Sequence, residues 1–173
     1  MTVTITRRIP DLNWSLRKWL ETLQYAVGST TGTLKTHFAG LTIRAAYPDD
    51  LIAIKTPVLA LVGGDSQSGQ DFFGEEITET LHQFSIFGFV AGQGGDGQNR
   101  AYRDRLVSDL FMLLQGTAGS EGIDLYSQAN PVSVIGSFEV DTQTVRVRLI
   151  PSNAPIVEAD KYKFVCEFEL QYV

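Results

Sequence analysis

Two stretches of the chain carry apolar residues at the three- and four-residue spacing of an amphipathic helix. The first covers residues 11–27, with Gly28 at its end, and the second covers about residues 99–115, with Asn99 as its cap and Gly116 as its stop. Both helices are therefore predicted to pack one face on a core. Their apolar stripes consist of Leu12, Leu16, Trp19, Leu20, Leu23 and Val27, and of Tyr102, Leu106, Leu110, Leu113 and Leu114.

Alternating or continuous apolar residues predict strands in most of the remaining chain. Residues 33–64 read as short strands broken by turns, and residues 76–91 as one long strand whose second half is apolar on both faces, as in the centre of a sheet. The segments 134–140 and 144–150 predict a hairpin whose turn is Asp141-Thr142-Gln143. Residues 161–173 alternate with period two, which indicates a half-solvated antiparallel strand. A short strand is also expected near Ile123.

This order of elements predicts an α+β fold, a mainly antiparallel sheet packed against two helices, with long loops. The chain of 173 residues is 43% hydrophobic and 20% charged, which is ordinary globular composition, so residues 1–173 are expected to form a single domain. The net charge of −6 disfavours binding of DNA over the whole surface. Cys166 is the only cysteine, which excludes an intrachain disulfide. No signal peptide or run of about 18 apolar residues occurs, so a soluble protein made in a reducing cytoplasm is expected, without membrane contact.

One motif suggests nucleotide chemistry: Gly92, Gly94 and Gly97 match G-x-G-x-x-G between a strand and a helix. With Asn99 as the helix cap, however, all three glycines precede the helix, so the third cannot serve close packing of helix on strand. The chain then continues with hairpins, where a dinucleotide-binding fold needs further βα units. We therefore expect a flexible strand-to-helix connector and no cofactor.

No other pattern points to catalysis or to metal binding. His37 and His82 lie far apart, and neither belongs to a ligand motif. Cys166 alternates with aromatic residues and is expected to be a small core residue. There is no Gly-Lys-Ser/Thr and no G-x-S-x-G, and the carboxylates are scattered along the chain. The chain is predicted not to be an enzyme, with no catalytic residue and no metal ligand.

Contacts with other proteins are expected at two polar loops, residues 64–75 and 92–99, and at the helix that follows them. The two adjacent aromatics in the first loop either make such a contact or fold back onto the core, and Trp14 lies either at the core edge or in a subunit contact. The arginines that begin the second helix form either a solvated face with local ion pairs or a docking face for an acidic partner, with DNA a lesser option. The interface candidates are Asp65, Gln70, Asp71, Phe72, Phe73, Gln93, Asp96, Arg100 and Arg103.

The order of elements resembles that of the tail terminator, or tail completion, proteins of long-tailed bacteriophages. The resemblance spans about residues 12–173 and rests on a helix, then "GLTIRAAYPDDLIAIKTPVLALVGG", then a long strand ending "FSIFGFVAG", the helix "NRAYRDRLVSDLFMLLQ", "IDLY" and terminal strands. The resemblance consists of this arrangement of elements and of the long strand, glycine loop and arginine-bearing helix that follow one another. The family has no residue-level motif to match, so no individual role is carried over.

The resemblance implies a homo-oligomeric ring, most simply a hexamer, in the virion tail or neck, assembled in the host bacterial cytoplasm. Such a ring binds the last ring of tail tube protein, stops tube growth and offers a surface to the head–tail connector or stopper protein. Genomic DNA passes through its lumen without specific binding. Ring closure needs a heterologous contact between neighbours, for which the terminal strand as a sheet edge and the two long loops are the candidates. The alternatives are another neck, stopper or sheath-capping protein of the same machine, or a small-ligand-binding domain.

Overall fold

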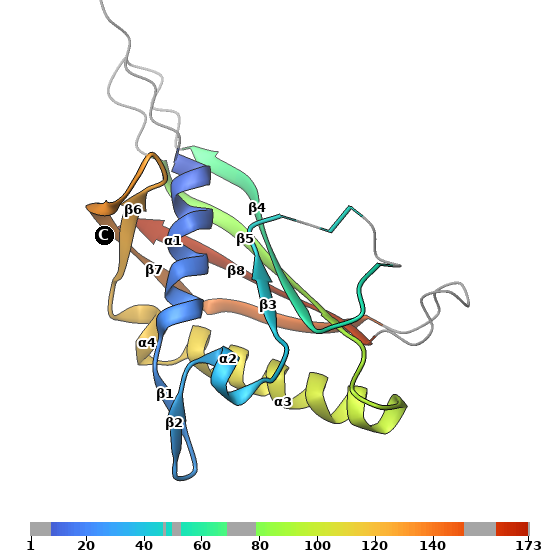
Figure 1. Ribbon diagram of the computed structural model, residues 1–173. Helices are drawn as coiled ribbons and strands as arrows, with labels where there is room; N and C mark the ends of the chain where they lie inside the picture. The colour runs from blue at the N-terminus through green and yellow to red at the C-terminus, as the bar shows by residue number, and fades with distance from the viewer. Residues whose placement is uncertain (1–7, 47, 50–52, 69–78, 151–161, 173) are drawn as a thin grey trace, which may run out of the picture.

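The computed structural model describes residues 8–46, 48–49, 53–68, 79–150 and 162–172. Its elements, in chain order, are α1 (Arg8–Thr22), β1 (Tyr25–Val27), β2 (Thr30–Gly32), α2 (Leu34–His37), β3 (Thr42–Arg44), β4 (Val58–Ser68), β5 (Glu79–Val90), α3 (Asp96–Gln115), α4 (Thr117–Ser120), β6 (Ile123–Ser127), β7 (Asn130–Ile150) and β8 (Tyr162–Tyr172). Within these residues six strands form one sheet, in the order β3-β4-β5-β8-β7-β6 (Figure 1). Only the β3–β4 pair is parallel among its described pairs. The predicted α+β fold with a mainly antiparallel sheet is confirmed.

The two long helices α1 and α3 cover the same face of this sheet (Figure 1). The stripe predicted for α3 is buried in full, as are the leucines of the stripe predicted for α1 at positions 12, 16 and 20. They meet the inward residues of β5 and β8, which lie at every second position of each strand and are mostly apolar. These include Phe84, Ile86, Val90, Phe164, Cys166, Phe168 and Leu170.

A second, smaller core lies on the opposite face, where β4 begins and β5 ends. Val58, Ala60 and Phe89 are buried there together with Ile54, which belongs to the segment leading into β4. This end of β5 is therefore buried on both faces, as its continuous apolar pattern predicts.

The first helix is shorter than predicted, because the chain folds into a hairpin directly after it. α1 ends at Thr22, and β1 pairs with β2 through a two-residue turn between Val27 and Thr30. Gly28 occupies that turn with φ of +61°, a conformation that favours glycine. The glycine that we expected to end the helix therefore turns a hairpin instead.

The predicted hairpin between residues 134 and 150 is wrong, because these residues belong to one strand, β7. Asp141 pairs with Glu169 and Arg146 with Glu167, so the supposed turn is a bulge within the strand. Thr144 closes this bulge: its Oγ1 donates to the Asp141 carbonyl at 2.7 Å and accepts the Glu169 N–H at 2.8 Å. Turn-forming residues in the middle of a strand thus produced the false hairpin signal.

The terminal strand β8 shows the predicted alternation but not the predicted position. It pairs with β5 on one side and with β7 on the other, so it lies in the middle of the sheet. The expectation that the terminal strand offers a sheet edge for ring closure is therefore wrong. Among the described strands of this sheet the edges are β3 and β6.

Candidate subunit interfaces

The glycine loop is tied to the helix that follows it. Asn99 lies inside α3 and is buried, and its Oδ1 accepts the N–H of Gln93 at 3.0 Å. Gln93 also donates from its side chain to the carbonyl of Ala91 at 3.4 Å. The expectation that Asn99 caps the helix is wrong, because its side chain is used across the loop and α3 begins earlier, at Asp96. Gly97 consequently lies in the first turn of the helix and not before it.

The surroundings of the loop explain its first glycine without a nucleotide. A Cβ atom on Gly92, whose φ is +75°, would overlap the carbonyl oxygen of Lys55. Glycine therefore lets the backbone that enters β4 approach the loop closely. The carboxylate of Asp96 stands in the first turn of α3, where a phosphate would need positive surroundings. Since β5 is flanked by antiparallel strands on both sides, the βα arrangement of a dinucleotide site is not formed here.

The arginines at the start of α3 differ in how far the fold occupies them. Arg103 forms an ion pair with Asp104 at 2.7 Å and its guanidinium carbon lies 5.2 Å from the ring centroid of Tyr162, leaving its side chain 12% exposed. Arg100 lies 5.8 Å from the same ring and is exposed. Local contacts thus hold Arg103, whereas Arg100 presents its charge to solvent.

The structure brings only some of the nine interface candidates together. Gln93, Asp96, Arg100 and Arg103 gather where β5 passes into α3. Asp65 lies within β4, which extends into the segment expected to be a loop. The remaining candidates, Gln70, Asp71, Phe72 and Phe73, lie outside the described residues.

Sequence reasoning missed a first exposed surface, the β1–β2 hairpin. No charged residue stands between Glu21 and Lys35. The hairpin projects past the C-terminal end of α1 (Figure 1), and among the described strands β1 and β2 pair only with each other. Val27 is 48% exposed, and Thr30 and Thr31 are exposed as well. The absence of charge between Glu21 and Lys35 was the feature of the sequence that could have indicated this surface.

A second uncharged surface lies where β6 turns into β7, and we call residues 130–136 the β7 ledge. No charged residue stands between Asp124 and Glu139. The ledge carries three exposed apolar side chains, of which Val132 is 84% exposed; the others are Val134 and Ile135. Its pairing with β6 is irregular, and β8 pairs with β7 only from Phe138 onward, so no described strand covers the second edge of the ledge.

The chain holds the β7 ledge firmly against α1. Ser15 is 1% exposed, and its Oγ accepts the N–H of Tyr126 at 2.8 Å and donates to the Tyr126 carbonyl at 3.4 Å. Asp11 accepts the N–H of Gln128 at 2.8 Å. The ammonium of Lys18 lies 3.5 Å from the centroid of the Tyr126 ring, a cation–π contact. The turn that leads into the ledge is therefore fixed along α1 by residues from Asp11 to Lys18.

The base of the β1–β2 hairpin is held near the C-terminal end of α1. Tyr25 donates its hydroxyl to Asp109 of α3 at 2.9 Å, and the carbonyl of Tyr25 lies 3.2 Å from Nε2 of His37. Burial, together with the hydrogen bond to Asp109, raises the pKa of Tyr25 well above its ordinary value. The Tyr25 hydroxyl therefore stays protonated and keeps its role as a donor.

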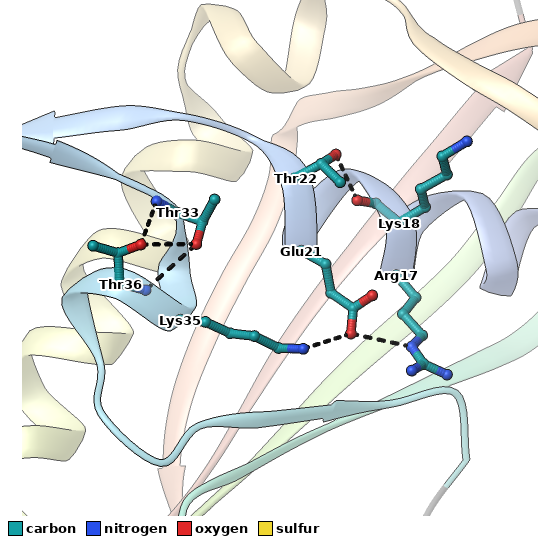
Figure 2. A network of polar contacts seen from close by, with 7 residues as sticks. All are labelled: Arg17, Lys18, Glu21, Thr22, Thr33, Lys35 and Thr36. Carbon is teal, nitrogen blue, oxygen red and sulfur yellow. Dashed lines mark hydrogen bonds and ion pairs between the residues drawn. The ribbon is translucent and has the colours of Figure 1, made fainter.

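Ion pairs also stabilise the base of the β1–β2 hairpin, as Figure 2 shows. Glu21 of α1 accepts from Lys35 of α2 at 3.0 Å and from Arg17 at 3.4 Å, which joins the two helices across the hairpin. Thr33 and Thr36 form a capping box at the start of α2. The hairpin is thus anchored at its base while its strands project.

Several further features of the described residues bear on possible chemistry. A shallow hollow of about 390 Å³ is lined mainly by polar residues of β5, β7 and β8, including Gln83, Arg146 and Glu167. No group of three or more potential ligands in the described part could hold a metal ion. Burial raises the pKa of Cys166 to about 12, which disfavours its thiolate at neutral pH. None of the described helices has the length and apolar character that a membrane span requires.

Neither protein-family models nor curated proteins supply a function for this chain. No protein-family model matches the chain. No curated protein matches it either. The order of the elements and the exposed surfaces of the chain are therefore the features that bear on its function.

Proposed function

We propose that this chain is a structural subunit of a bacteriophage tail, of the tail terminator type, and not an enzyme. It assembles with copies of itself into a ring, most simply a hexamer, that caps the tail tube next to the head. The ring ends tube polymerisation and offers its other face to the head connector. A neck, stopper or sheath-capping role in the same machine is the alternative.

The observation that carries the self-assembly part of this proposal is the pair of exposed, uncharged strand segments, the β1–β2 hairpin and the β7 ledge. The phage-tail part rests on the order of the elements. Natural proteins often protect free strand edges with charged side chains, prolines or bulges, and this protein has a net charge of −6. In the ledge only Pro131 and the irregular pairing with β6 serve this purpose. Here both the β1–β2 hairpin and the β7 ledge lack charged residues and expose valines. Two different surfaces that face different directions suit a heterologous contact, the kind that closes a ring.

The order of the elements supports the same proposal. A helix and short strands come first, and the long strand β5, the glycine loop and α3 follow in the arrangement on which the family resemblance rests. β7 and β8 then complete the sheet. In such a ring the genomic DNA passes through the lumen, where an acidic subunit makes no specific contact with phosphates.

A tube-growth assay tests the proposal. Tail tube protein of the same phage is polymerised with and without the full chain, and tube lengths are measured by electron microscopy. A terminator shortens the tubes in proportion to its concentration and leaves a ring at one tube end. Tubes of unchanged length with bare ends would contradict the proposal.

A further inference from the structure

We infer that the β1–β2 hairpin of one copy binds the β7 ledge of a second copy by strand addition, so that each subunit gives one contact and receives one. This inference rests on the proposed self-assembly, and it specifies which surfaces perform it. Neither surface was among the interface candidates drawn from the sequence.

The hairpin has the properties of the inserted element. A two-stranded ribbon with no further sheet partner is marginally stable in water, so an added strand contact stabilises it. Its outer edges carry backbone donors and acceptors that no other described strand pairs. Thr30 and Thr31 are β-branched residues that suit a ladder, and the exposed Val27 supplies apolar surface.

The β7 ledge has the properties of the receiving element. Its second edge has no described strand beside it until Phe138, and Val132, Val134 and Ile135 stand exposed along it. The hydrogen bonds from α1 to the preceding turn hold it in place before any partner arrives. A pre-formed acceptor reduces the entropy lost on binding.

The occupant of the ledge is a second copy because the chemistry and the geometry of this chain supply both halves of the contact. Two copies that each carry a charge of −6 repel one another, and contact through two neutral segments avoids placing like charges opposite each other. Contacts from Asp11, Ser15 and Lys18 hold the ledge side along α1, whereas the hairpin projects past the C-terminal end of that helix (Figure 1), so it points away from the ledge of its own chain. A contact between two unlike surfaces leaves one of each surface free, so the same contact can repeat from subunit to subunit until the ring closes.

Charge insertion with mixing tests the contact. Val27→Asp impairs the hairpin and Val132→Asp impairs the ledge, while Met112→Asp, at an apolar α3 position 66% exposed and outside both surfaces, is the matched control. We expect either interface variant to weaken self-association about tenfold or more, and the control to leave it unchanged. Far-UV circular dichroism checks that all three variants fold.

Mixing the two interface variants gives the decisive result. At a concentration where each variant alone is monomeric, an equimolar mixture still holds one intact hairpin and one intact ledge, so it should form a dimer and no larger species. Light scattering then reports twice 19.1 kDa for the mixture. A mixture that stays monomeric, or interface variants that assemble like the control, would overturn the inference.

Cysteine cross-linking tests the same contact if the subunits assemble only at tube ends and not in solution. Val27→Cys mixed with Val132→Cys and oxidised with copper phenanthroline on tubes should give a disulfide-linked dimer, whereas Val27→Cys mixed with Met112→Cys should not. If rings form without this cross-link, the inference fails and the proposed ring stands. If the unmodified chain forms no ring with or without tubes, both fail.

Discussion

Replacing the buried Ser15 with alanine should destabilise the protein, because it removes two hydrogen bonds to the backbone of Tyr126. The Ser15 hydroxyl satisfies both backbone groups of Tyr126, with a good hydrogen bond at 2.8 Å and a weaker one at 3.4 Å. Losing the first and leaving a backbone N–H unpaired costs about 1–3 kcal/mol. Alanine regains about 0.5 kcal/mol of helix propensity. The expected net loss is about 0.5–2.5 kcal/mol, or about 1–10 °C in Tm for a chain of this size.

Urea unfolding followed by circular dichroism measures this loss. Ser108→Ala, at an exposed position on α3, is the control and should lie within about 0.5 kcal/mol of the unmodified chain. If the Ser15 hydroxyl fixes the β6–β7 turn, Ser15→Ala should also weaken self-association. A loss in stability no larger than that of the control would refute the assigned anchoring role.

Three further changes test the packing and the titration of buried groups. Gly88→Ala should cost about 1–3 kcal/mol because the new Cβ meets the ring of Phe164, and Phe164→Leu should recover part of that loss in a double-mutant cycle followed by urea unfolding. Asn99→Ala should cost about 1–3 kcal/mol and speed hydrogen exchange in the glycine loop, because it frees the amide held by that side chain. Burial raises the pKa of Cys166 from 9.0 to about 12 and that of Tyr102 from 10.0 to about 12, so the unfolded chain loses these protons first. The stability that these two groups contribute should therefore be constant below about pH 8 and fall as the pH rises through 9 to 12, and Cys166→Ala should reduce that slope in urea titrations.

The sequence predicted the elements in which one periodicity holds over a long stretch. The apolar stripe of α3 and the alternation of β8 are confirmed. In each element the buried residues recur at a constant spacing, about one helical turn in α3 and two residues in β8. The prediction was wrong at residues that are common in two kinds of local structure. Gly28 can end a helix or turn a hairpin, and Asn99 can cap a helix or bond across a loop, and tertiary contacts decide between them.

Strand order could not be predicted, because pairing depends on contacts distant along the chain. Nothing in the alternation of β8 distinguishes a central strand from an edge, and the bulge at Asp141 resembles a turn until its partner Glu169 is known. The hairpin and the ledge were missed for a related reason. A missing charge is informative only where the residue is exposed, and exposure of Val132 follows from how β7 passes the end of β8.

The mass of the full chain in solution, with and without purified tail tubes, tests the central claim most directly. Light scattering combined with electron microscopy should show a closed ring whose mass is a multiple of 19.1 kDa, most simply six copies, or a ring that forms only at tube ends. A chain that keeps the mass of one copy in both conditions, beside tubes with bare ends, would contradict the account.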